Sequence, residues 1–184
     1  MTQVCLVGSE DVNLRYELLS RETARNALAT YDLQEPFENT IAVDTVSLGA
    51  AVALLNDLNW YLVRFADTAF IRDPSISETE WLSRDLAAAI RDDDVAPEDT
   101  GRFLTVYGIV EPDDTSDATD DDVPEAATEP TSEPGPGATM EADSPPELVD
   151  PMLLTRTGDT IPEYDLQEVD DTLIVRVTES EFGA

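Results

Sequence analysis

The sequence contains no lysine and no histidine, and its only cysteine is Cys5. Without histidine there is no histidine general base and no zinc site built from cysteine and histidine. Without lysine there is no Schiff-base or phosphate-binding lysine, and a lone cysteine cannot form an intramolecular disulfide. Because the usual nucleophile–base pairs and metal cages are excluded, we predict no catalytic residue, no metal ligand and no cofactor.

Long apolar runs are missing as well. The longest apolar stretch, around residues 48–55, is followed by polar residues. It is shorter than the roughly eighteen apolar residues that a membrane helix needs. The first eight residues contain no basic region and no apolar segment of signal-peptide length. We therefore expect a soluble, cytoplasmic protein that does not associate with membranes.

Positive charge is scarce, since ten arginines stand against 41 aspartates and glutamates and the net charge is -31. Such a charge repels itself at low salt and disfavours contact with nucleic-acid phosphates. At molar ionic strength the Debye length is about 3 Å, so the repulsion nearly vanishes. Because the acidic residues are spread along the whole chain, we predict a halophilic protein that does not bind nucleic acid directly. An ordinary acidic protein with a disordered tail is the alternative.

Composition divides the chain into three parts. Residues 1–110 alternate between strand-like and helix-like apolar patterns and are expected to form an α/β domain. Residues 111–147 contain seven of the twelve prolines and no basic residue, so we predict a disordered acidic insert. Residues 148–184 regain strand patterns but are too few to fold alone. We expect this C-terminal β segment to dock on the sheet of residues 1–110 and to add antiparallel edges.

Apolar periodicity predicts the secondary structure. Strands are expected at residues 2–7, 40–46, 60–65, 69–72, 102–110, 152–157 and 172–178, and helices at residues 9–30 and 47–58. A turn is expected at Asp67 before the strand at 69–72. Ser77 and Glu80 have the spacing of a capping box, which is expected to open a third helix. We predict an α+β fold with a mixed β-sheet and about three helices, arranged as a ferredoxin-like sandwich. A small doubly wound α/β fold is the alternative.

The most distinctive local sequence is the run from Asn56 to Tyr61, where a helix is expected to meet a strand. Asparagine, aspartate and aromatic side chains at such a junction can line a groove for a protein partner or a small ligand. The alternative is a helix end with asparagine in a left-handed conformation, followed by aromatic residues of the core. The predicted ligand- or partner-binding residues are Asn56, Asp57, Asn59, Trp60, Tyr61 and Arg64.

The scarce arginines are informative. Arg64 lies in a predicted strand, where its charge needs a partner. Arg64, Arg102 and one helical arginine can together bind an anion or an acidic partner. The alternative, which we favour, is that the arginines pair with the many carboxylates of the same chain, as Arg21 can with Glu17.

The segment Val46–Val52, with the sequence VSLGAAV, together with Asn56–Tyr61 resembles a haloarchaeal protein family of unknown function. The resemblance covers residues 1–110 and the C-terminal strands. It implies a haloarchaeal cytoplasm, and it implies no activity, cofactor or catalytic residue.

Together, these observations predict a non-enzymatic module that binds a protein partner or a small ligand, whose identity the sequence leaves open. The alternative is an enzyme that uses carboxylates, with Mg²⁺ held by Asp57 or Asp67.

Overall fold

The computed structural model describes residues 1–112, 144–158 and 171–183. Seven strands form one mixed sheet. The strands are β1 (Thr2–Gly8), β2 (Thr40–Thr45), β3 (Ala66–Arg72), β4 (Trp81–Ser83), β5 (Phe103–Val110), β6 (Glu147–Thr155) and β7 (Asp171–Arg176). The helices are α1 (Leu14–Leu19), α2 (Glu22–Leu28), α3 (Leu48–Asp57), α4 (Asn59–Phe65), α5 (Arg84–Arg91) and α6 (Glu179–Phe182), with a short 3₁₀-helix at Pro97–Asp99.

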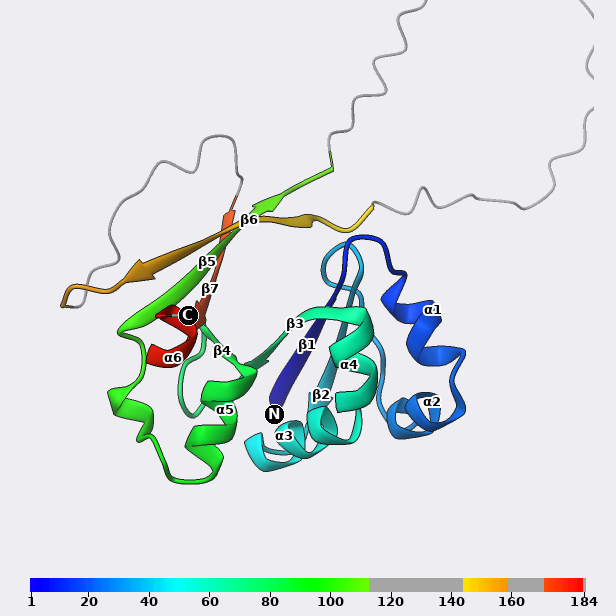
Figure 1. The fold of residues 1–184 in the computed structure, drawn as a ribbon, viewed down its shortest axis with the longest axis horizontal. Coiled ribbons are helices and arrows are strands. Elements are labelled where there is room, and N and C mark those ends of the chain that lie inside the picture. Colours follow the sequence, from blue (N-terminus) through cyan, green and yellow to red (C-terminus); the bar gives the residue numbers. More distant parts are fainter. Residues whose placement is uncertain (113–143, 159–170, 184) are drawn as a thin grey trace, which may run out of the picture.

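The strand order across the sheet is β2-β1-β3-β4-β7-β5-β6 (Figure 1). The pairs are antiparallel except for β4 with β7, which run parallel. The α+β class is therefore confirmed. The expected number of about three helices is not confirmed, because the described residues contain six α-helices. Neither the ferredoxin-like arrangement nor the doubly wound alternative is established.

The last strand of the chain lies inside the sheet. β7 hydrogen-bonds to β4 on one side and to β5 on the other, while β6 forms the outer edge. The expectation that the C-terminal strands add antiparallel edges therefore holds for β6 and is wrong for β7. The three-part domain division itself stays a prediction, and most of the segment predicted to be disordered, residues 113–143, lies outside the described residues.

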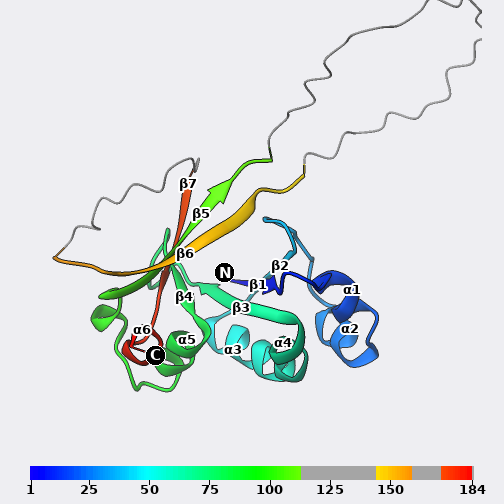
Figure 2. The same ribbon diagram turned by 45° about the horizontal axis from the view of Figure 1, so that its top comes forward.

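Alternation along the strands separates two apolar clusters on the two faces of the sheet. On β1, Val4 and Leu6 face the cluster that packs against the helices, whereas Cys5 between them belongs to the cluster on the opposite face. Figure 2 shows α3, α4 and α5 on one side of the strands. On the other face, the ring of Phe70 in β3 lies 5.3 Å from that of Tyr107 in β5.

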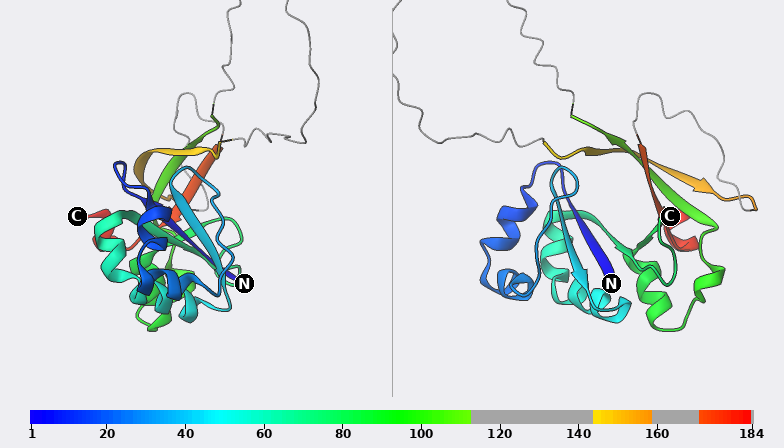
Figure 3. Two further views of the ribbon diagram at one scale, coloured as in Figure 1. Left: turned by 90° about the vertical axis from the view of Figure 1, so that its right-hand side faces the viewer. Right: turned by 180° about the vertical axis from the view of Figure 1, so that it is seen from behind.

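The strands β5, β6 and β7 extend away from the helical layer as a twisted group (Figures 2 and 3). The chain just before β6 nevertheless returns to the first half of the sheet, because the Glu38 amide donates to the Pro146 carbonyl at 2.8 Å. The segment before β6 is thus tied to the loop that precedes β2.

The single helix predicted at residues 9–30 is wrong, since two short helices form there. Asn13 caps α1 by accepting a hydrogen bond from the Tyr16 amide at 2.9 Å. Arg21 then adopts an extended conformation that separates α1 from α2. Each helix buries its own apolar pair against the sheet, Leu14 and Leu18 from α1, and Ala24 and Leu28 from α2.

The predicted third helix forms as α5, but its predicted start at Ser77 is wrong. The Ser77 hydroxyl does accept a hydrogen bond from the Glu80 amide at 3.1 Å, as in a helix cap. The chain then enters β4 instead of a helix, and α5 begins only after Ser83, whose hydroxyl accepts from the Leu86 amide at 3.2 Å. The Glu80 side chain does not close a capping box because two distant arginines, Arg156 and Arg176, hold it.

Candidate functional site

The residues predicted as a strand at 60–65 form helix α4. Leu58, fully buried, connects α3 to α4, and its carbonyl accepts a hydrogen bond from the Leu62 amide at 3.0 Å. Leu58 and Leu62 lie one helical turn apart and both belong to the core beneath the sheet. Their burial outweighs the strand propensity of the neighbouring aromatic and branched residues. The turn predicted at Asp67 is also wrong, because β3 begins at Ala66 and Asp67 lies within this strand.

Trp60 projects from α4 with 51% of its surface exposed. Arg64 lies one turn further along, with its guanidinium carbon 3.8 Å from the centroid of the Trp60 ring, and its Nη1 donates to the Trp60 carbonyl at 3.0 Å. Arg21, the residue before α2, approaches the same ring. Its guanidinium carbon lies 5.9 Å from the centroid of the Trp60 ring and 4.9 Å from that of the Phe65 ring. A cation held over an aromatic face in this way is attracted by the ring electrons. We call Arg21, Trp60 and Arg64 the arginine–tryptophan surface.

The two arginines of this surface differ in their charge partners. The Arg21 Nη2 atom lies 3.2 Å from a carboxylate oxygen of Glu17, so this predicted pair is confirmed. Arg64 forms no ion pair with any carboxylate of the described residues. In a chain with 41 acidic residues, an exposed arginine without such a partner departs from the favoured expectation that arginines pair internally.

The structure divides the predicted site residues between two places. Asn56 faces α5, where its Oδ1 accepts a hydrogen bond from Arg84 Nη2 at 3.3 Å, and Asp57 is exposed beside it. On α4, Asn59 is exposed, and Trp60 lies edge-on to Tyr61 with 5.0 Å between ring centroids. The buried Leu58 separates the two groups, so the six predicted residues do not line one groove.

The alternative of a left-handed asparagine cap is wrong at this junction. In the described residues the positive φ angles outside glycine belong to Asn39, Asp93 and Asp150, and neither Asn56 nor Asn59 is among them. Instead, the Arg84 guanidinium reaches the Leu55 carbonyl at 3.4 Å and so satisfies an acceptor at the end of α3.

The sequence did not reveal which arginine joins Arg64. Arg102, which was expected to join Arg64 together with one helical arginine, lies over Phe103 at 5.3 Å and takes no part in the arginine–tryptophan surface. Arg21 takes that place because α1, α2 and α4 lie side by side at one end of the sheet (Figure 1). No short-range spacing in the sequence signals a contact between Arg21 and Trp60.

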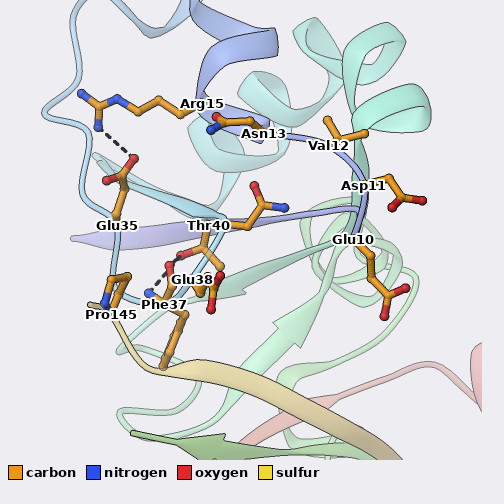
Figure 4. A pocket seen from close by; sticks show the side chains of 11 residues that line it. Glu10, Asp11, Val12, Asn13, Arg15, Glu35, Phe37, Glu38, Thr40 and Pro145 are labelled. Atoms are coloured by element: carbon orange, nitrogen blue, oxygen red, sulfur yellow. Dashed lines mark hydrogen bonds and ion pairs between the residues drawn. The ribbon is translucent and has the colours of Figure 1, made fainter. Parts of the chain in front are cut away.

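A concave region of about 510 Å³ lies between the loop after β1 and the loop before β2 (Figure 4). Arg15 on its rim is ion-paired with Glu35 at 3.0 Å. Asn39 also lines it, and its side chain accepts a hydrogen bond from the Leu14 amide and donates one to the Ser9 carbonyl. The remaining charged lining residues are all acidic: Glu10, Asp11 and Glu38.

The carboxylates give no support to the magnesium alternative. Within residues 1–112, 144–158 and 171–183, no group of three or more histidine, cysteine, aspartate or glutamate side chains is placed to hold a metal ion. Asp57 and Asp67 therefore belong to no such group. The charge of Asp67 instead acts on Tyr107, where burial first, and then the charges of Asp67 and Glu181, raise the tyrosine pKa to about 12.

Cys5 is fully buried in β1. Burial raises the pKa of its thiol to about 12, although a hydrogen bond with Thr40 acts in the opposite direction. Because the thiolate is the nucleophilic form, this cysteine stays un-ionised and inert at neutral pH.

A buried charge cluster joins distant parts of the sheet. Glu80 forms ion pairs with both Arg156, which follows β6, and Arg176 at the end of β7, whose Nη2 lies 3.0 Å away. Burial alone would raise the pKa of Glu80, but the hydrogen bonds and charges of the two arginines outweigh it and lower that pKa. Gly101, with a φ of +93°, leaves room for the arginines where a side chain would meet them. The cluster therefore connects the residue before β4 with the residue after β6 and the last residue of β7.

No helix in the described part of the chain combines the length and the apolar character needed to cross a membrane. A known family, described as a family of unknown function (DUF5804), matches residues 2–109. The match spans more than half of the chain and includes the arginine–tryptophan surface, so the chain belongs to this family. The expected resemblance is thereby confirmed, and the haloarchaeal origin stays a prediction. No curated protein and no solved structure matches the chain.

Proposed function

We propose that the protein is a non-enzymatic module that binds a protein partner through the arginine–tryptophan surface, in the concentrated salt of a haloarchaeal cytoplasm. The observation that carries this proposal is the exposure of Trp60 together with Arg64 stacked over its ring at 3.8 Å. Tryptophan and arginine are the side chains most enriched among residues that dominate the energy of protein interfaces.

The shape of the surface favours a protein over a small molecule. Small ligands bind in concave sites that enclose most of their surface. Trp60 and Arg64 instead project from α4, and the concave region of Figure 4 is lined by other residues. A partner with a complementary face can cover Trp60 without any pocket in this chain.

The same surface suits an environment of high salt. With a net charge of -31, the chain repels acidic neighbours at long range unless salt screens it. At molar ionic strength the screening length is about 3 Å, which removes long-range repulsion and leaves direct contacts such as ring burial and stacking. A contact surface built on Trp60 therefore remains effective where charge steering does not.

A matched pair of variants tests the proposal. Trp60→Ala removes the exposed ring of α4, while Leu153→Ala removes a side chain of similar exposure, 49%, from β6 at the far edge of the sheet. Tagged full-length chains are used to capture partners from cell extract in molar KCl, with quantification by mass spectrometry. We expect a stoichiometric protein that is retained by wild type and Leu153→Ala and lost by Trp60→Ala.

Unfolding midpoints of both variants provide the control for folding, since neither residue is buried. Recovery of the wild-type protein alone contradicts the proposal, as does a partner that Trp60→Ala retains. Recovery of the protein alone returns attention to a small ligand, whereas a partner that Trp60→Ala retains binds another surface of the chain.

A further inference from the structure

We infer that the partner presents a carboxylate next to an apolar side chain, with Arg64 receiving the carboxylate and Trp60 the apolar group. The inference rests on the proposed function, because it names the chemistry of the partner at the same surface.

The hydrogen-bonding capacity of Arg64 carries the first step. Arginine offers several N–H donors in a planar fork that matches the two oxygens of a carboxylate. Within the described residues, Arg64 uses one side-chain donor, Nη1, on the Trp60 carbonyl, and it has no carboxylate partner. Arg64 is exposed, so its remaining side-chain donors, which have no partner among the described residues, are available to an acceptor brought by a partner.

Two contacts within α4 restrain the guanidinium of Arg64. Its carbon lies 3.8 Å from the Trp60 ring centroid, and the bond to the Trp60 carbonyl holds one end of the fork. A side chain that is held in place before binding loses less conformational entropy when it binds. Arg64 thus meets a carboxylate in a conformation that the free protein already has.

Trp60 and Val63 supply the apolar half of the recognition. Val63 is 73% exposed and lies three residues after Trp60, so the two side chains are neighbours on the surface of α4. Arg64 follows immediately in the sequence, and Arg21 lies over the Trp60 ring while remaining paired with Glu17. The exposed face of α4 therefore combines an apolar strip with one cation that has no carboxylate partner in the described residues.

Exposed tryptophan and arginine can also stack on the bases of single-stranded nucleic acid. Such binding needs a positively charged groove that follows the phosphates. Here Arg21 is paired with Glu17, so the surface offers the single cation Arg64, which suffices for one carboxylate and is too little to follow a row of phosphates. The observations favour an acidic protein segment, and nucleic acid becomes an outcome of the test.

Two peptide libraries test the inference on the full-length chain. In the first, each fluorescently labelled peptide contains leucine flanked by aspartate or glutamate; in the second, asparagine and glutamine replace the acids. Fluorescence polarisation in molar KCl measures binding. We expect wild type to bind the acidic library about tenfold more tightly than the amide library, the difference that one good charge-assisted contact provides.

The variants separate charge from apolar contact. Arg64→Gln is expected to abolish the preference for acidic peptides, and Trp60→Ala to weaken binding to both libraries. The matched control is Arg102→Gln. Like Arg64, Arg102 is exposed, lies over an aromatic ring and has no ion pair in the described residues. It differs in its place, because it directly precedes β5 and is not part of the arginine–tryptophan surface. This control is expected to keep the wild-type preference.

Failure of the inference is distinguishable from failure of the proposed function. If wild type shows no preference for acidic peptides, or if Arg64→Gln keeps that preference, the carboxylate inference is overturned. Partner capture that still depends on Trp60 then leaves the proposed function standing. Tight binding of a labelled single-stranded oligonucleotide that Trp60→Ala abolishes overturns the inference in favour of nucleic acid.

Discussion

Glu80 is the residue on which the two halves of the sheet depend most directly. Its side chain is buried and holds two of the chain's ten arginines, Arg156 and Arg176. Replacing it with glutamine keeps the shape and leaves two largely buried positive charges without their counter-charge. We expect Glu80→Gln to lower the free energy of unfolding by about 3 kcal/mol, as measured by denaturant unfolding in molar KCl.

Glu35→Gln is the matched control, because the ion pair of Glu35 with Arg15 is exposed to solvent. Exposed pairs contribute little, so the control is expected to change the free energy of unfolding by about 0.5 kcal/mol or less. Equal effects of the two substitutions would show that burial of the Glu80 cluster has no energetic consequence.

The lowered pKa of Glu80 also predicts an acid dependence of stability. The folded-state pKa lies below the ordinary value, so the unfolded chain binds more protons between the two values. The stabilisation is therefore complete above the ordinary carboxyl pKa and is lost as the pH falls through the folded-state pKa. Asp73 acts in the same direction: burial opposes the shift, but hydrogen bonds from Ser75 and Thr2 lower its pKa.

We expect the free energy of unfolding, measured against pH in molar KCl, to fall on the acid side less steeply for Glu80→Gln than for wild type. The residual slope comes from groups such as Asp73. Identical slopes for the two proteins would mean that Glu80 keeps its ordinary pKa in the folded state.

Residue types were easier to predict than residue contacts. The sequence indicated that Arg21 can pair with Glu17 and that Trp60 and Arg64 belong to a distinctive segment, since these depend on local spacing and pattern. It did not indicate that Glu80 holds Arg156 and Arg176, because those partners lie 76 and 96 residues away along the chain. Contacts of that range are fixed by the topology of the sheet.

At the scale of elements, the sequence predicts those with a clear apolar pattern and misses those whose boundaries carry no marker. The strands at β1, β2 and β5 and the helix α3 lie close to their predicted ranges. The break at Arg21 contains neither glycine nor proline, so the predicted helix continued through it. For α4, aromatic and branched side chains indicated a strand, and only the packing of Leu58 and Leu62 under the sheet decides for a helix.

The central position of β7 predicts the result of a truncation. A chain that ends at residue 170 lacks β7 and its buried Leu173 and Val175, and it leaves β4 and β5 without a shared partner. Burial of each such side chain contributes about 2 kcal/mol, a large fraction of the total stability of a domain. We expect this chain to show no cooperative unfolding transition by circular dichroism.

A chain that ends at Thr178 is the control, because it keeps β7 and removes α6. Its transition is expected to remain cooperative, at a lower midpoint, since the contact between Phe103 and Phe182 is lost. A cooperative transition in the shorter chain would contradict the structural role of β7.

At the scale of the whole molecule, the net charge predicts a strong effect of salt. The Debye length falls from about 30 Å at 0.01 M to about 3 Å at 1 M, so repulsion among exposed acids weakens over this range. We expect the midpoint of thermal unfolding to rise steeply as KCl increases. A midpoint that does not change with KCl would contradict the halophilic prediction.

The exposed run Asp92–Asp94 after α5 offers a variant to check the cause. Changing the three aspartates to asparagine moves the net charge from -31 to -28, because three negative charges are removed. This variant is expected to unfold at a higher temperature than wild type in low salt and at a similar temperature in molar salt. Equal differences at both salt concentrations would point to a local effect instead of net charge.

The place of β7 also constrains the order in which the protein can be completed on the ribosome. The other six strands precede β7 in the chain, and before β7 emerges no strand joins β2-β1-β3-β4 to the β5–β6 pair. During that interval β4 and β5 each present an unpaired edge, the kind of edge that other chains can add to. The nascent protein therefore exposes both of these edges until β7 emerges, and the pairing of β7 with β4 and β5 closes the sheet.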